Sequence, residues 1–127
     1  MATARKGIRL THVNHVVYLV HDRERSLRFY RDLLGLREIP SMTPNPDVTW
    51  LQLPSGVMVH LVEDKGAPIP ERLHSAFEVE DYDAVVAALQ ALGVRIERSG
   101  ERKDGQRFLF IRDPDGNLVE LCTPSRF

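Results

Sequence analysis

The fold of this chain is decided by the stretch Asn14-His-Val-Val-Tyr-Leu-Val-His-Asp-Arg-Glu-Arg-Ser-Leu-Arg-Phe-Tyr-Arg-Asp-Leu-Leu-Gly-Leu36. Residues 10–20 are rich in β-branched and aromatic side chains, a composition typical of a strand. Asp22 is suited to cap the start of a helix, and Gly35 to the left-handed conformation just past its end. Apolar side chains recur between them at helical spacing. The stretch therefore predicts a strand followed by an amphipathic helix.

The same arrangement returns in the second half of the chain. His74-Ser-Ala-Phe-Glu-Val79 matches the first strand, Asp81 matches the helix cap, and Gly93 matches the helix end. Three short strand candidates follow each helix, and a tight turn containing proline and glycine joins the last two of each set. These candidates are residues 36–39, 48–53 and 57–63 in the first copy, and residues 94–98, 106–112 and 117–123 in the second.

Each copy places two potential metal ligands at equivalent points. His15 and His74 open the two copies. His60 and Glu120 each stand four residues after the glycine of the last turn in their copy. One such histidine alone is more often a hydrogen-bonded core residue, and Glu120 alone could be a salt-bridged strand residue. Four ligand-type side chains at repeat-equivalent points instead favour a pseudo-symmetric metal site formed by His15, His60, His74 and Glu120.

Strand geometry supports this grouping. Side chains alternate across a strand, so His15 shares a face with Val17 and Leu19, whereas Tyr18 and Val20 should pack under the helices. The other three candidates also have mostly apolar neighbours on their faces, which is the usual setting of a metal site in a cavity. A carboxylate such as Glu120 is costly there unless it is paired or coordinated.

We therefore expect an α+β fold of two tandem βαβββ modules, with curved mixed sheets around a metal-binding cleft. The modules should span about residues 8–63 and 72–124 of a single domain covering residues 1–127. His12 and His21 have no counterpart in the second copy and are expected at the surface. Cys122 is expected to be a small buried hydrophobe.

Composition excludes several classes of function. Lys plus Arg (17) nearly balances Asp plus Glu (18), so no strong field attracts nucleic acid or an anionic membrane. No apolar run approaches the roughly 18 residues that span a bilayer. The single cysteine suits a reducing compartment, and residues 1–7 lack the apolar core of a signal peptide. A cytoplasmic protein that acts on small molecules is the expectation.

Two segments resemble a known family. Residues 14–36 are similar to the opening of the vicinal oxygen chelate superfamily, which includes glyoxalase I, bleomycin-resistance proteins and extradiol dioxygenases. Asp113-Pro-Asp-Gly-Asn-Leu-Val-Glu-Leu121 resembles its closing hairpin, whose glutamate is a metal ligand. The resemblance covers essentially the whole chain, and it is specific to the superfamily but not to one activity. By position, the four ligand points of glyoxalase I fall on His15, His60, His74 and Glu120.

The resemblance implies a divalent metal ion, which could be iron, nickel, cobalt, manganese or zinc. It also implies a homodimer in which His15 and His60 of one subunit face His74 and Glu120 of the other; alternatively, the two halves of one chain close the site. Glyoxalase I-type sites carry a carboxyl-derived ligand where this chain has His60, so the correspondence is incomplete.

Two functions follow from these observations. The first is a metal-dependent isomerase, lyase or dioxygenase acting on a small molecule that chelates through vicinal oxygens, with Glu120 as the catalytic proton carrier. The second is a bleomycin resistance-type protein that binds a drug or metabolite without turnover. Residues 41–47 and 99–105 form equivalent loops that should border the site, and their unknown geometry leaves the substrate open.

Overall fold

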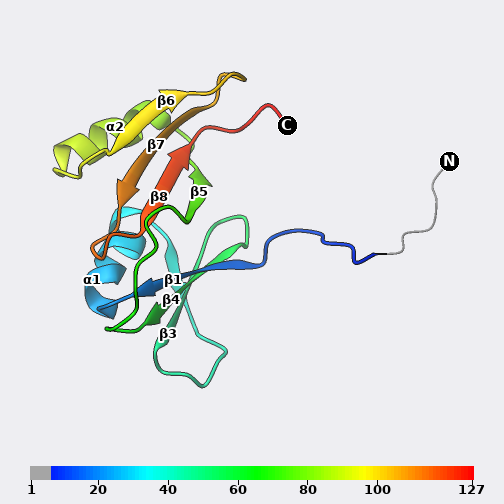
Figure 1. Ribbon diagram of the computed structural model, residues 1–127, viewed down its shortest axis with the longest axis vertical. Coiled ribbons are helices and arrows are strands. Elements are labelled where there is room, and N and C mark those ends of the chain that lie inside the picture. The colour runs from blue at the N-terminus through cyan, green and yellow to red at the C-terminus, as the bar shows by residue number, and fades with distance from the viewer. Residues whose placement is uncertain (1–6) are drawn as a thin grey trace.

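The computed structural model describes residues 7–127. It contains two four-stranded sheets, each with a helical segment on one face (Figure 1). The strands are β1 (His15–Val20), β2 (Arg37–Ile39), β3 (Val48–Gln52), β4 (Met58–Glu63), β5 (His74–Glu78), β6 (Arg98–Glu101), β7 (Arg107–Arg112) and β8 (Leu118–Cys122). Their order is β1-β4-β3-β2 in one sheet and β5-β8-β7-β6 in the other. The first and last strands of each module pair in parallel, and the other neighbours pair antiparallel. The predicted α+β fold with mixed sheets is confirmed.

The helices begin and end where the sequence predicts. They are α1 (Arg23–Leu27), its π-helical continuation η1 (Arg28–Leu33), and α2 (Tyr82–Ala91). The carboxylates of Asp22 and Asp81 each accept a hydrogen bond of 3.0 Å from the backbone N–H three residues later. Gly35 (φ 77°) and Gly93 (φ 71°) adopt the left-handed conformation just after the helices. The π-helical turn has no signal in the spacing of the apolar residues. Neither helical segment of the described chain is long and apolar enough to cross a membrane.

Two strands start later than predicted. β1 begins at His15 rather than residue 10, and residues 8–14 extend away from the modules (Figure 1). Ile8 and Leu10 are accordingly 92% and 90% exposed. β6 begins at Arg98 rather than residue 94, because the N–H of Val94 instead donates to the carbonyl of Leu89 at the end of α2. A β-propensity pattern becomes a strand only where a neighbouring strand can pair with it.

The core forms on the helix-covered faces of the sheets. Tyr18 and Val20 are buried there as predicted, together with Leu61 of the adjacent strand. The opposite face of β1 is open, and Val17 remains 52% exposed. The face that carries His15 is therefore accessible in the single chain.

A buried carboxylate joins the second hairpin to the first module. Asp113 accepts hydrogen bonds from the Tyr30 hydroxyl (2.7 Å), from the backbone N–H of Asn117 (2.8 Å) and from the Asn117 side chain (2.9 Å). The same Asn117 amide donates to the carbonyl of Leu19 in β1 (2.9 Å). Burial and the charge of Asp113 raise the pKa of Tyr30 well above its usual value, so this hydroxyl keeps its proton and donates. The closing-hairpin segment therefore positions one module on the other.

The neighbouring Asp115 reinforces this connection. Its carboxylate accepts from the backbone N–H of His21 (3.0 Å) and pairs with Arg25 of α1. His21, expected at the surface, is half-buried there, and its Nε2 lies 2.8 Å from the carbonyl of Ala67. His12 is exposed, as predicted.

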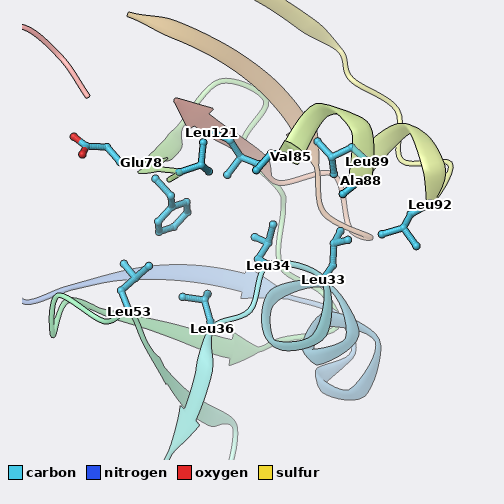
Figure 2. Close-up of a pocket in the computed structure, with 12 residues that line it drawn as sticks. Leu33, Leu34, Leu36, Leu53, Glu78, Val85, Ala88, Leu89, Leu92 and Leu121 are labelled. Atoms are coloured by element: carbon cyan, nitrogen blue, oxygen red, sulfur yellow. The ribbon is translucent and has the colours of Figure 1, made fainter. Parts of the chain in front are cut away.

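Apolar side chains meet in the crevice between the modules. Figure 2 shows Leu34, Leu36 and Leu53 of the first module pointing toward Leu89 and Leu121 of the second. The crevice keeps a cavity of about 200 Å³. Burial of these side chains adds a nonpolar contribution to the hydrogen bonds of the hairpin.

Replacing Asp113 with Ala should lower the free energy of unfolding by about 3 kcal/mol or more, because several buried donors lose their acceptor at about 1–3 kcal/mol each. Urea unfolding followed by circular dichroism measures the change. The matched control is Ser55→Ala in the equivalent, exposed turn of the first module, where a change within about 0.5 kcal/mol is expected. Equal stability of the two variants would contradict the role given to Asp113.

Candidate metal centre

The first module presents two histidines beside the only tryptophan of the chain. His60 lies in the middle of β4, directly opposite Trp50 of β3, and the two rings stack at 4.4 Å between centroids. His15 stacks on the other side of His60 at 4.1 Å. His60 is only 7% exposed, and its Nε2 has no hydrogen-bond partner among residues 7–127. Such a buried, unpartnered nitrogen is available to a metal ion.

The protonation of these histidines suits metal binding. Burial, with a smaller contribution from neighbouring His15, lowers the pKa of His60, which favours the neutral imidazole. In the second module, Nδ1 of His74 lies 2.9 Å from the carbonyl of Arg72. A carbonyl only accepts, so Nδ1 donates to it, and this contact directs Nε2 toward Glu120. His15 makes the equivalent contact to the Asn14 side chain at 2.8 Å. Metal-ligating histidines typically have such a second hydrogen bond.

The second module pairs a histidine with a carboxylate. Glu120 is 4% exposed, and its Oε1 lies 3.0 Å from Nε2 of His74. Two ligand atoms about 2.1 Å from one ion, at right angles, lie about 3 Å apart, so this separation suits a shared ion. The second oxygen of Glu120 accepts from the Arg102 guanidinium (3.0 Å), and Phe110 packs edge-on against His74 at 5.1 Å.

The four predicted ligands come together as two pairs. His15 lies with His60, and His74 lies with Glu120, each pair on the open face of a different sheet. Within residues 7–127 there is no group of three or more His, Cys, Asp or Glu side chains that could hold a metal ion. In this arrangement the two halves of one chain do not close around a common ion. The assignment of the four residues as ligands stays a prediction.

Three side chains beside these pairs were not singled out from the sequence. Trp50 and Phe110 occupy equivalent register positions, one opposite His60 and the other opposite Glu120. The internal repeat could have identified both. Arg102 lies in the loop that joins β6 to β7, where no repeat position marks it. Cys122 is buried as expected, and burial raises the pKa of its thiol.

Comparison with known proteins places this geometry in a family. The sequence model of the Glyoxalase/Bleomycin resistance protein/Dioxygenase superfamily matches residues 12–121. The chain belongs to this superfamily. Among curated members, it is 31% identical to glyoxylase I 4 of Arabidopsis thaliana, over 91% of this chain and 72% of that protein. It is 30% identical to the lactoylglutathione lyase of Haemophilus influenzae, over 84% of this chain and 88% of that enzyme.

Solved structures of the superfamily share the fold. A glyoxalase family protein from Bacillus anthracis superposes with a TM-score of 0.82 at 21% identity, over 94% of this chain and 99% of that one. A glyoxalase/dioxygenase from Nostoc punctiforme gives a TM-score of 0.78 at 21% identity, over 98% of this chain and 100% of that one. These likenesses establish the architecture and leave the reaction open.

The stacking of Trp50 on His60 makes the tryptophan a reporter of the predicted site. We expect Ni²⁺ to quench Trp50 fluorescence, because an ion with a partly filled d shell accepts excitation energy from an indole close to it. The quenching should saturate with Ni²⁺ and reverse with a chelator. It should disappear in His60→Gln and persist in the exposed control His12→Gln. Equal quenching in both variants would place Ni²⁺ elsewhere.

Proposed function

We propose that this protein is a divalent-metal-dependent enzyme acting on a small molecule that chelates through vicinal oxygens. The proposal depends on one observation: the four predicted metal ligands are divided into two pairs, one in each module. Each module offers two suitably held ligands, too few for a closed site, on a face left open in the single chain. A homodimer would unite His15 and His60 of one subunit with His74 and Glu120 of the other.

The donors fit a divalent ion of the first transition series. Three neutral imidazoles and one carboxylate are suitable for iron, nickel, cobalt, manganese or zinc. The unpartnered Nε2 of His60 and the 3.0 Å separation of His74 Nε2 from Glu120 Oε1 support this choice. Curated relatives include a lactoylglutathione lyase and the metallothiol transferase FosB of Staphylococcus saprophyticus, the latter 29% identical over 87% of this chain.

The residues around the site have different roles in the proposed reaction. A bound ion would supply Lewis acidity to a chelated carbonyl or hydroxyl oxygen. Glu120 is the only carboxylate among the four, and it is the group that takes and returns the substrate proton. Its Oε1 lies beside His74, where the ion would bind, and its Oε2 accepts from Arg102. Trp50 and Phe110 place apolar rings against the histidines of the two halves.

The presence of His60 in place of a second carboxylate limits the reactions that the site could catalyse. An imidazole adds no negative charge, so the site is more Lewis acidic than one with two carboxylates. It also leaves Glu120 as the sole base among the ligands. One-base isomerisation, addition of a nucleophile or iron-dependent oxygenation fits this set better than proton shuttling between two carboxylates.

Replacing Glu120 with Gln should preserve much of the metal content and remove most turnover, since the amide still offers an oxygen but cannot carry the proton. Elemental analysis and activity assays on candidate oxygen-chelating substrates measure the two effects. Glu101→Gln, on an exposed glutamate of β6, is the control and should behave like wild type. Full activity of Glu120→Gln would reject the catalytic role.

Mixing two inactive variants tests the shared site. A heterodimer of His15→Ala and Glu120→Ala subunits would contain one site lacking both residues and one site with all four ligands. We therefore expect half of the sites in each heterodimer to regain metal and activity after subunit exchange. Exchange verified by mass spectrometry without any recovery would reject sharing between subunits.

The alternative function is binding without turnover, as in bleomycin-resistance proteins. It is favoured by the way Arg102 and His74 satisfy Glu120 without an ion. Two measurements separate the functions. A sequestering protein should purify without metal, and it should keep its affinity for the ligand in the presence of a chelator. The balanced charge and single cysteine fit activity on a small molecule in the cytoplasm.

A further inference from the structure

We propose that the substrate carries an anionic group, a carboxylate or a phosphate, that binds Arg98 beside the Glu120 half of the site. This inference rests on the proposed function, since it describes the other end of the same substrate. It follows from the position of Arg98, from the rings that hold its guanidinium group, and from the charge around it.

Arg98 lies on the face of the second sheet that carries Glu120. In the strand register, Arg98 of β6 is opposite Phe110 of β7, which is in turn opposite Glu120 of β8. Two strand spacings separate the backbones of Arg98 and Glu120 by about 10 Å. Arg98, Phe110 and His74 line one cavity of about 580 Å³. A small molecule bound at His74 and Glu120 is therefore within reach of the Arg98 side chain.

Two phenylalanines orient the two guanidinium groups. The Cζ atom of Arg98 lies 5.2 Å from the ring centre of Phe110 and 5.8 Å from that of Phe108. Arg102 lies closer to Phe108, at 4.0 Å. The Phe108 ring occupies the space above Gly100, where a Cβ atom would come within 3.0 Å of it. Cation–π contact with Phe110 thus holds the Arg98 guanidinium beside the cavity that His74 also lines.

The charges near these arginines are not balanced. The exposed side chain of Arg98 forms no ion pair with any residue that the structure describes. By contrast, Arg112 of the same cavity lies 3.0 Å from Glu97 and donates to two backbone carbonyls. The carboxylate partner of Arg102 is Glu120, the predicted metal ligand. The cavity that Arg98 lines also contains Glu71, Glu97, Arg72 and Arg112, so its positive side chains outnumber its negative ones by one. An anionic substrate group balances this excess positive charge.

The geometry also indicates the kind of anion. Guanidinium groups bind carboxylate and phosphate oxygens through paired N–H donors. One molecule then occupies both ends of the site, with its chelating oxygens at the ion and its anionic group on Arg98. A neutral chelating molecule lacks the second contact.

The test is isothermal titration calorimetry of metal-loaded protein with inorganic phosphate and, separately, with acetate. The variants are Arg98→Gln, Arg98→Lys and the control Arg95→Gln, which removes a guanidinium that is 85% exposed and pairs with Glu97 at 3.8 Å. Arg98→Gln should weaken the preferred anion by about ten- to a hundredfold, the range for losing a hydrogen bond to a charged group. Arg98→Lys should weaken it less, and Arg95→Gln should leave it unchanged.

The preferred anion identifies the substrate group: tighter phosphate points to a phosphorylated substrate and tighter acetate to a carboxylic acid. Equal affinities in Arg98→Gln and wild type, or no binding of either anion by wild type, would overturn the inference. Elemental analysis of the same samples tests the proposed function separately. Arg98-dependent anion binding by a protein that takes up no metal would reject the metal-dependent function and retain the anion site.

Discussion

The buried carboxylate of Asp113 is the interaction on which the relation between the two modules depends. A charged group in the core is costly unless its oxygens are satisfied, and here the donors come from both halves of the chain. Tyr30 supplies a hydroxyl from the first module, and Asn117 supplies its backbone and side chain from the second. Because Asn117 also donates to Leu19, the hairpin and β1 are held in one relative position.

That position has a consequence for the chemistry. With the modules joined through Asp113 and the apolar crevice of Figure 2, the open face of each sheet is left without a cover from its own chain. The His15–His60 pair and the His74–Glu120 pair are then two halves that one chain keeps apart. The proposed metal site would therefore need a second copy to complete it, because the contacts that stabilise the single chain keep the two pairs apart.

Local features of the sequence predicted much of this structure. Asp22 and Asp81 cap helices because capping involves neighbours only three residues away. Strand alternation correctly separated Tyr18 from Val17 because it depends only on backbone geometry. The matching ends of the two copies identified residues that the structure brings together in pairs.

The remaining features depend on contacts between distant segments. The start of β6 was displaced because residues near 94 complete the end of α2 instead of pairing with β7. The partner of Asp113 in the first module lies 83 residues away, so the sequence motif gave no sign of its role between modules. Arg102 approaches Glu120 from a loop whose path no periodicity describes.

The two Pro-x-Gly hairpins occupy equivalent positions in the two copies but have different structural roles. Gly56 and Gly116 have the same φ angle of 100°. Only the second hairpin, however, carries an aspartate, Asp113, that accepts a hydrogen bond from the other module. The first has Leu53 at that point, in the apolar crevice, and an exposed tip. The first turn should therefore accept an inserted peptide at little cost. An insertion in the second turn would disturb the hydrogen bonds by which Asp113 and Asn117 contact the first module.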